Sequence, residues 1–178
     1  MSDAAVARWR QQGHLYVWRY KDRRKYPDWH LTADALCCRS LADLIQTMLC
    51  ARYSSHCRLK VTPPTSEILS GPNFGGGQAI WRPVSSLVLN YPKNSVPEDC
   101  FLIEMDKDDL KLSVGQLKLQ AFREAILALP WGDGDYAIGS NDDDDTSPSL
   151  WFWWMPRPPR YVPVHKRGYY LQPRKKLR

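Results

Sequence analysis

Apolar and polar positions along the chain follow two periods, one typical of helices and one typical of strands. Leu41 and the apolar residues after it recur at spacings of three and four, and so do Leu119 and the residues that follow it. A serine begins each run, Ser40 and Ser113, with a polar capping-box residue three positions later. The pattern therefore predicts two principal helices, the second ending at Pro130. A shorter helix is predicted over 4–11.

Strand-forming segments surround these helices. The segments 15–20 and 29–32 are rich in aromatic and β-branched residues and are joined by a polar turn, which predicts a hairpin. If Tyr20 faces Pro27 in that hairpin, Trp18 lies opposite Trp29. Further strands are predicted at 57–61, once or twice within 78–91, and at 101–106, 136–138 and 150–155.

The two principal helices also resemble each other. At an offset of 73 residues Ser40 falls on Ser113 and Leu49 falls on Phe122, and each helix has a strand before it and after it. This indicates two similar strand, helix, strand halves, although such helix patterns are common enough to coincide. We expect an α+β fold: one domain over 1–156, with a mostly antiparallel sheet of six or more strands, two principal helices and an extended basic tail over 157–178.

Composition fits one domain of ordinary kind. The chain has 178 residues, 43% of them hydrophobic, which suffices for a core. The amino terminus lacks the apolar run of a secretory signal, and no stretch reaches the roughly 20 apolar residues of a membrane span. Five cysteines without framework spacing are typical of free thiols. We therefore expect a cytoplasmic protein; the sequence leaves its oligomeric state open.

Signals for metals, cofactors and catalysis are weak. Cysteines and histidine between Cys37 and Cys57 lack the paired spacing of a zinc site, and the consecutive aspartates from Asp142 match no calcium loop. The glycine-rich segment 71–77 lacks the lysine of a phosphate loop, and no nucleophile turn is present. We expect no cofactor and no metal. A metal-dependent nuclease remains a third hypothesis, using Asp28 with Glu104, Asp106 and Lys107, or with Asp109 and Lys111.

Charge is the strongest functional signal. The net charge of +6 divides into about +6 over 1–60, −8 over 61–156 and +8 over 157–178. Cations interleaved with tyrosines suit phosphate contacts and base stacking. The first hypothesis is thus a non-catalytic protein that binds nucleic acid through a hairpin tip and the tail. The residues assigned to this role are Arg19, Lys21, Arg23, Arg24, Lys25, Arg157, Arg160, Lys166, Arg167, Arg174, Lys175, Lys176 and Arg178.

The acidic middle of the chain supports two other interpretations. The tail could dock on it, which would make the tail's partner internal. Alternatively, the acidic surface could bind a protein with a basic surface, as an immunity or antitoxin-like inhibitor does, because complementary charge speeds association and selects partners. The residues assigned to this role are Asp106, Asp108, Asp109, Asp142, Asp143, Asp144 and Asp145.

Overall fold

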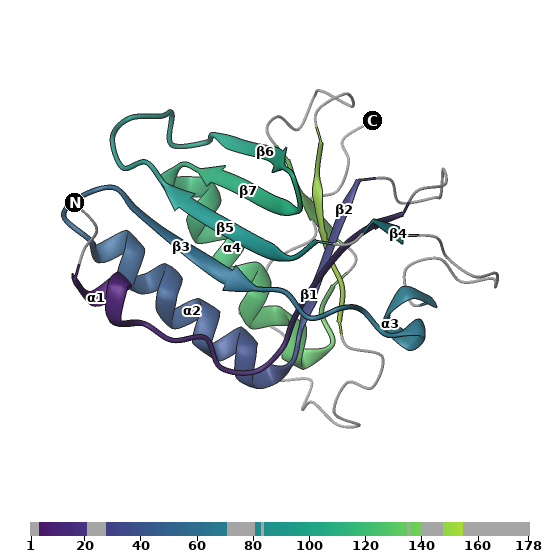
Figure 1. Cartoon of the computed structure of the whole chain (residues 1–178). Coiled ribbons are helices and arrows are strands. Elements are labelled where there is room, and N and C mark those ends of the chain that lie inside the picture. The colour runs from purple at the N-terminus through teal and green to yellow at the C-terminus, as the bar shows by residue number, and fades with distance from the viewer. Residues whose placement is uncertain are drawn as a thin grey trace, which may run out of the picture.

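Nine strands and four α-helices make up the part of the chain that the computed structural model describes, which covers residues 4–20, 28–70, 81–82, 84–134, 136–139 and 148–154 (Figure 1). The helices are α1 (Ala4–Arg8), α2 (Ala35–Cys50), α3 (Ser66–Ser70) and α4 (Gln116–Ala128), which continues into the 3-10 turn η1 (Leu129–Trp131). The strands are β1 (Leu15–Tyr20), β2 (Trp29–Ala33), β3 (Ser55–Lys60), β4 (Trp81–Arg82), β5 (Ser86–Tyr91), β6 (Phe101–Asp106), β7 (Asp109–Val114), β8 (Tyr136–Ile138) and β9 (Leu150–Phe152).

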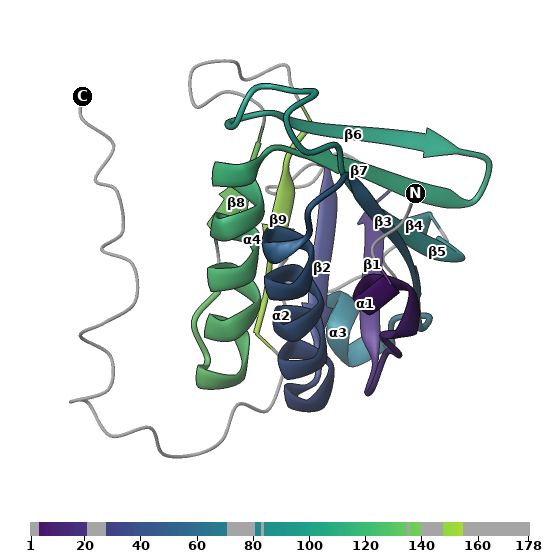
Figure 2. The same ribbon diagram turned by 90° about the vertical axis from the view of Figure 1, so that its left-hand side faces the viewer.

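The strands form two sheets, which confirms the α+β class and shows that the prediction of one sheet with six or more strands was wrong. Sheet A has the order β4-β1-β2-β9-β8, and sheet B has the order β3-β5-β7-β6. Figure 2 shows α2 and α4 side by side with sheet A behind them, and one continuous core joins both helices to both sheets. The buried residues of α2, which include Cys37, Leu41 and Leu44, belong to this core. Strand patterns in the sequence do not show which distant strands pair, and this pairing divides the strands between two sheets.

The chain divides into two halves of the same topology that exchange strands. The first half runs β1, β2, α2, β3, β5, and the second runs β6, β7, α4, β8, β9. Each sheet takes a hairpin from one half and an antiparallel pair from the other, joined by one parallel contact: β2 with β9 in sheet A, and β5 with β7 in sheet B. Two similar halves were predicted, but an exchange of strands between them was not.

The correct offset between the halves is 81 residues, the separation of the helix caps Asp34 and Gly115, and the predicted offset of 73 was wrong. At the correct offset the buried positions of β2 and α2 coincide with those of β7, α4 and η1. The matched buried pairs are Trp29 with Leu110, Leu31 with Leu112, Ala33 with Val114, Cys38 with Leu119, Leu41 with Phe122, Leu44 with Ala125, Ile45 with Ile126 and Met48 with Leu129.

Neither principal helix is capped by the serine that the sequence predicted, Ser40 or Ser113. Asp34 caps α2, and its Oδ1 accepts a hydrogen bond from the Cys37 N–H at 2.7 Å, so the helix starts six residues earlier than predicted. Ser40 lies inside the helix, where its hydroxyl instead accepts from the Gln12 N–H. Ser113 belongs to β7, and Gly115 caps α4.

Four further local predictions were wrong. The hairpin register is shifted by one residue, so that Trp18 lies opposite His30, because Asp28 leaves the extended ladder with a φ of 75°. Strand β7 was missed between a predicted strand and a predicted helix, and α3 was missed inside a proline-containing connection. The first helix ends at Arg8, earlier than expected.

In the described part of the chain, no helix has the length and apolar content that a membrane crossing needs.

Candidate functional site

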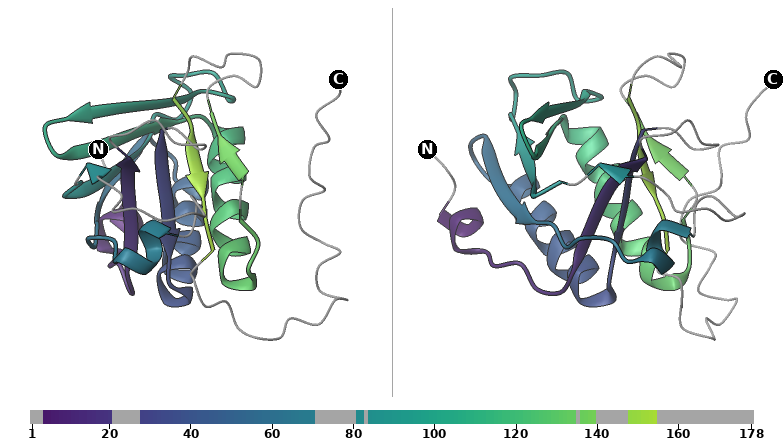
Figure 3. Two further views of the ribbon diagram at one scale, coloured as in Figure 1. Left: turned by 90° about the vertical axis from the view of Figure 1, so that its right-hand side faces the viewer. Right: turned by 45° about the vertical axis from the view of Figure 1, so that its right-hand side comes forward.

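The two sheets present very different outer faces. The outer face of sheet A is covered by α3, which lies on the side of this sheet opposite to α2 and α4 (Figures 1 and 3). Ile68 of α3 packs there with Trp18, Tyr20 and Trp153 in a second apolar cluster. His30 lies among these rings, fully buried and stacked on Trp18 with centroids 5.3 Å apart. This face is therefore filled by the chain itself.

The outer face of sheet B is mostly polar. Its outward side chains are exposed on the edge strands β3 and β6, half-buried on β7, and buried at Ser86 and Val88 of β5. In each strand of this sheet, one set of alternate side chains joins the core and the other set points outward, so four strands contribute three outward residues each. Cross-strand pairing arranges them in three rows. The rows, from β3 to β6, are Lys60, Ser86, Asp109, Asp106; Arg58, Val88, Lys111, Glu104; and His56, Asn90, Ser113, Leu102.

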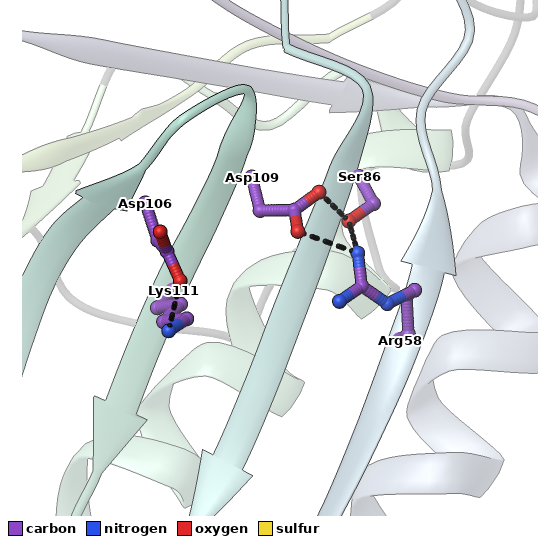
Figure 4. A network of polar contacts seen from close by, with 5 residues as sticks. All are labelled: Arg58, Ser86, Asp106, Asp109 and Lys111. Atoms are coloured by element: carbon purple, nitrogen blue, oxygen red, sulfur yellow. Dashed lines mark hydrogen bonds and ion pairs between the residues drawn. The ribbon is translucent and has the colours of Figure 1, made fainter.

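A hydrogen-bonded group joins three strands across this face (Figure 4). Arg58 Nη1 donates to Asp109 Oδ2 at 2.6 Å and to Ser86 Oγ at 2.7 Å, and Ser86 Oγ donates to Asp109 Oδ1 at 2.6 Å. The hydrogen bond from Ser86, followed by that from Arg58, lowers the pKa of the Asp109 carboxyl below its usual value of 3.8. Asp109 is thus an ionised structural partner of Arg58.

A second ion pair lies within the hairpin formed by β6 and β7. Lys111 Nζ donates to Asp106 Oδ2 at 2.6 Å, and this hydrogen bond raises the pKa of the lysine. Exposed Glu104 lies directly opposite Lys111 in the ladder and adds to the same effect. The hairpin holds four carboxylates and two lysines, Lys107 and Lys111, and therefore keeps a net negative charge.

The predicted acidic partner surface is brought together in part. Asp106, Asp108 and Asp109 all lie on the β6–β7 hairpin, with Asp106 and Asp108 exposed. Glu104 adds a carboxylate that was not assigned to this role, although its alternation with Leu102 and Asp106 was visible in the sequence. The run 142–145 lies outside the described residues.

The predicted nucleic-acid surface falls almost entirely on residues that the structure does not describe. Arg19 is the exception: its guanidinium lies 3.5 Å from an Asp28 carboxylate oxygen and 6.0 Å from the centroid of the Trp29 ring. The remaining residues assigned to this role, in 21–25 and 157–178, lie outside the described ranges.

The carboxylates of the nuclease hypothesis are not brought together. Asp28 precedes β2 of sheet A, where its carboxylate accepts from the Ser149 N–H, whereas Glu104 and Asp106 lie on β6 of sheet B. Within the described ranges, no group of three or more His, Cys, Asp or Glu residues is placed to hold a metal ion.

Burial raises the pKa of the Cys37 and Cys38 thiols to about 12 each, so both remain protonated at neutral pH.

An open hollow of about 450 Å³ lies where the segment after α1 meets α2. Trp9 forms part of its wall and is held there by a hydrogen bond from its indole Nε1–H to the Ser40 carbonyl at 3.0 Å. Arg10 and Arg39 line it together with Asp43, and all three residues are exposed, so solvent and salt screen the single excess positive charge. This hollow therefore points to no class of ligand.

Comparisons with protein-family models, with curated proteins and with solved structures find no match to this chain.

Proposed function

We propose that this protein is a non-catalytic binding protein whose β6–β7 hairpin binds a protein partner with a basic surface. The observation that carries the proposal is the gathering of Glu104, Asp106 and Asp108 on one exposed hairpin at the edge of an uncovered sheet face. Among the described residues, Glu104 and Asp108 have no ion-pair partner within 4.0 Å. Carboxylates left unpaired in this way attract cations and raise the rate of association with a basic surface.

The contrast between the two sheets supports the choice of this face. The chain covers the outer face of sheet A with α3 and aromatic side chains, while sheet B keeps a comparable face of polar and charged residues in solvent. The alternative explanation is that these charges only keep the surface soluble and prevent aggregation at the sheet edge. The two explanations differ in what neutralising the charges does to binding.

The experiment is purification of the full chain from its native cells, as the wild type and as the variant Glu104→Gln, Asp106→Asn, Asp108→Asn. We expect a stoichiometric protein partner that is retained at low salt, weakened at high salt and lost with the variant. The matched control, Asp43→Asn with Glu67→Gln, neutralises exposed carboxylates of α2 and α3 and should retain the partner. A partner that binds wild type and neutralised hairpin equally would overturn the proposal.

Nucleic-acid binding is a second candidate, carried by a different observation. Residues 157–178 contain eight lysines or arginines and no acidic residue. Deleting this segment should abolish binding to RNA or DNA without unfolding the domain, and the affinity of the full chain should fall steeply with salt concentration. Binding that survives the deletion, or that is absent even at low salt, would exclude this candidate.

A further inference from the structure

The β6 strand forms one edge of sheet B (Figures 1 and 2), and its free edge suggests how a partner binds. In the described part of the chain, β6 pairs with β7 and with no other strand. An edge strand of six residues offers a row of backbone donors and acceptors to any extended chain that approaches it.

The other sheet edges are shorter or obstructed. Sheet A ends in β4, which has two residues, and in β8, which has three. Sheet B also ends in β3, but there the Gln11 side chain occupies both backbone groups of Lys60: its Nε2 donates to the carbonyl at 2.9 Å, and its Oε1 accepts from the N–H at 2.8 Å. Among the described edges, β6 alone combines full strand length with unoccupied backbone.

The hairpin register identifies the backbone groups that face outward. Strands β6 and β7 are joined through Lys107 and Asp108, with Asp106 paired to Asp109. In a two-residue hairpin the pair that flanks the turn is hydrogen-bonded, so alternate residues counted back from Asp106 bond to β7. The Gly115 N–H donates to the Cys100 carbonyl at 2.8 Å, in phase with this alternation. The N–H and C=O groups of Phe101, Ile103 and Met105 therefore point away from β7. Phe101 is only 2% exposed, so the backbone groups that a partner could reach are those of Ile103 and Met105.

The side chains of β6 indicate what would pair there. Leu102 is 47% exposed on the outer face beside Glu104 and Asp106. A second copy of the chain pairing antiparallel at this edge would bring these carboxylates near their own counterparts, which opposes self-association. A strand with lysine or arginine at alternate positions would instead place cations beside them.

We propose that β6 accepts an extended, lysine- or arginine-rich segment of a partner protein as a fifth strand of sheet B. Main-chain hydrogen bonds to Ile103 and Met105 supply the affinity, and the carboxylates of Glu104 and Asp106 select basic side chains. This inference rests on the proposed function, because it specifies how the acidic hairpin would hold its basic partner.

The test uses two probe peptides with the full chain. One is an eight-residue peptide of alternating lysine and valine, blocked at both ends, and the other carries proline in place of its two central valines. We expect the first to bind with a dissociation constant below ~1 mM and the second to bind at least about tenfold more weakly, because proline cannot donate to a ladder. Amide exchange at Ile103 and Met105 should slow when the first peptide binds.

Variants separate strand addition from simple charge attraction. Met105→Pro removes an outward N–H and should weaken the first peptide by at least about tenfold, whereas Met105→Leu keeps that N–H and should bind like the wild type. Circular dichroism checks that each variant folds. If Met105→Pro does not fold, amide exchange in the wild type decides the question without it.

The outcomes distinguish this inference from the proposed function. If both peptides bind equally well, and both are lost with Glu104→Gln plus Asp106→Asn, the hairpin attracts basic partners without adding a strand, and the inference is wrong while the proposed function stands. If neither peptide binds at ~1 mM, the inference is wrong, and the purification experiment with the neutralised hairpin decides the proposed function separately. A dimer in sedimentation analysis that Met105→Pro dissociates would assign the edge to a second copy and also overturn the inference.

Discussion

The Trp153 indole donates its Nε1–H to Nδ1 of His30 at 2.8 Å, and this bond joins strand β2 to the residue that follows β9, 123 residues away in the sequence. Both side chains are buried, His30 fully. Because Nδ1 accepts, the neutral ring carries its proton on Nε2. The pair closes the outer face of sheet A over the contact between β2 and β9.

Replacing His30 with leucine leaves the Trp153 N–H without its acceptor in an apolar cluster. We expect His30→Leu to lower the free energy of unfolding by about 1–3 kcal/mol, measured by urea denaturation. The double variant with Trp153→Phe removes both partners, and its loss should be smaller than the sum of the two single losses. Strictly additive losses would contradict an energetic role for this bond.

Asp34 holds the start of α2 and the chain before β1 together. Its two carboxylate oxygens accept from the Cys37 N–H at 2.7 Å and from the His14 N–H at 2.8 Å. We expect Asp34→Ala to destabilise the fold by about 1–2 kcal/mol in thermal or urea unfolding. Asp43→Ala, an exposed substitution on the same helix, is the control and should stay within about 0.5 kcal/mol of the wild type. Equal losses in the two variants would argue against the cap.

Asp109 makes stability depend on acid. Its folded-state pKa is lowered from 3.8, chiefly by the Ser86 hydrogen bond and then by Arg58, so the unfolded chain binds its proton more readily. The stabilisation from Asp109 is therefore present above about pH 4 and is lost as the pH falls through the folded pKa. We expect Asp109→Asn to flatten the decline of unfolding free energy between about pH 4 and pH 2. An unchanged acid decline would show that Arg58 and Ser86 do not hold this carboxylate in solution.

The cysteines should differ sharply in reactivity. Cys50 is exposed, whereas Cys37 and Cys38 are fully buried and burial raises their pKa to about 12. At pH 8 we expect iodoacetamide to label Cys50 in the folded protein and to reach Cys37 and Cys38 only after denaturation. Mass spectrometry of the labelled peptides measures this. Rapid labelling of Cys38 in the folded state would mean that α2 opens locally.

Helices and most strands were predictable because their apolar residues repeat locally. Leu41 and Leu119 head stripes that the structure buries against the same core. Strand β7 was missed because its second-last residue, Ser113, looked like a helix cap. The alternation of apolar and polar residues before Ser113 was too short to outweigh that signal. The two-sheet arrangement could not be inferred, because it depends on which distant strands pair, and no local pattern carries that information.

The candidate site was predictable only as far as charge reveals it. Asp106 and Asp108 were found because acidic residues cluster in the sequence. Arg58 and Ser86 were missed because they come from β3 and β5, and they meet Asp109 only through cross-strand register. The free backbone of β6 was also invisible, since the edge of a sheet is known only once its strand order is known.

The exchange of strands between the two halves also constrains how the chain folds. Each sheet combines strands from both halves, and the hydrogen bond from the Ser149 N–H to the Asp28 carboxylate joins residues 121 positions apart. Such distant contacts slow folding, because a long loop must close before they form. During synthesis, the first half would expose unpaired strand edges until the second half emerges. Protection from aggregation therefore requires both halves and is not complete when the first half alone has been made.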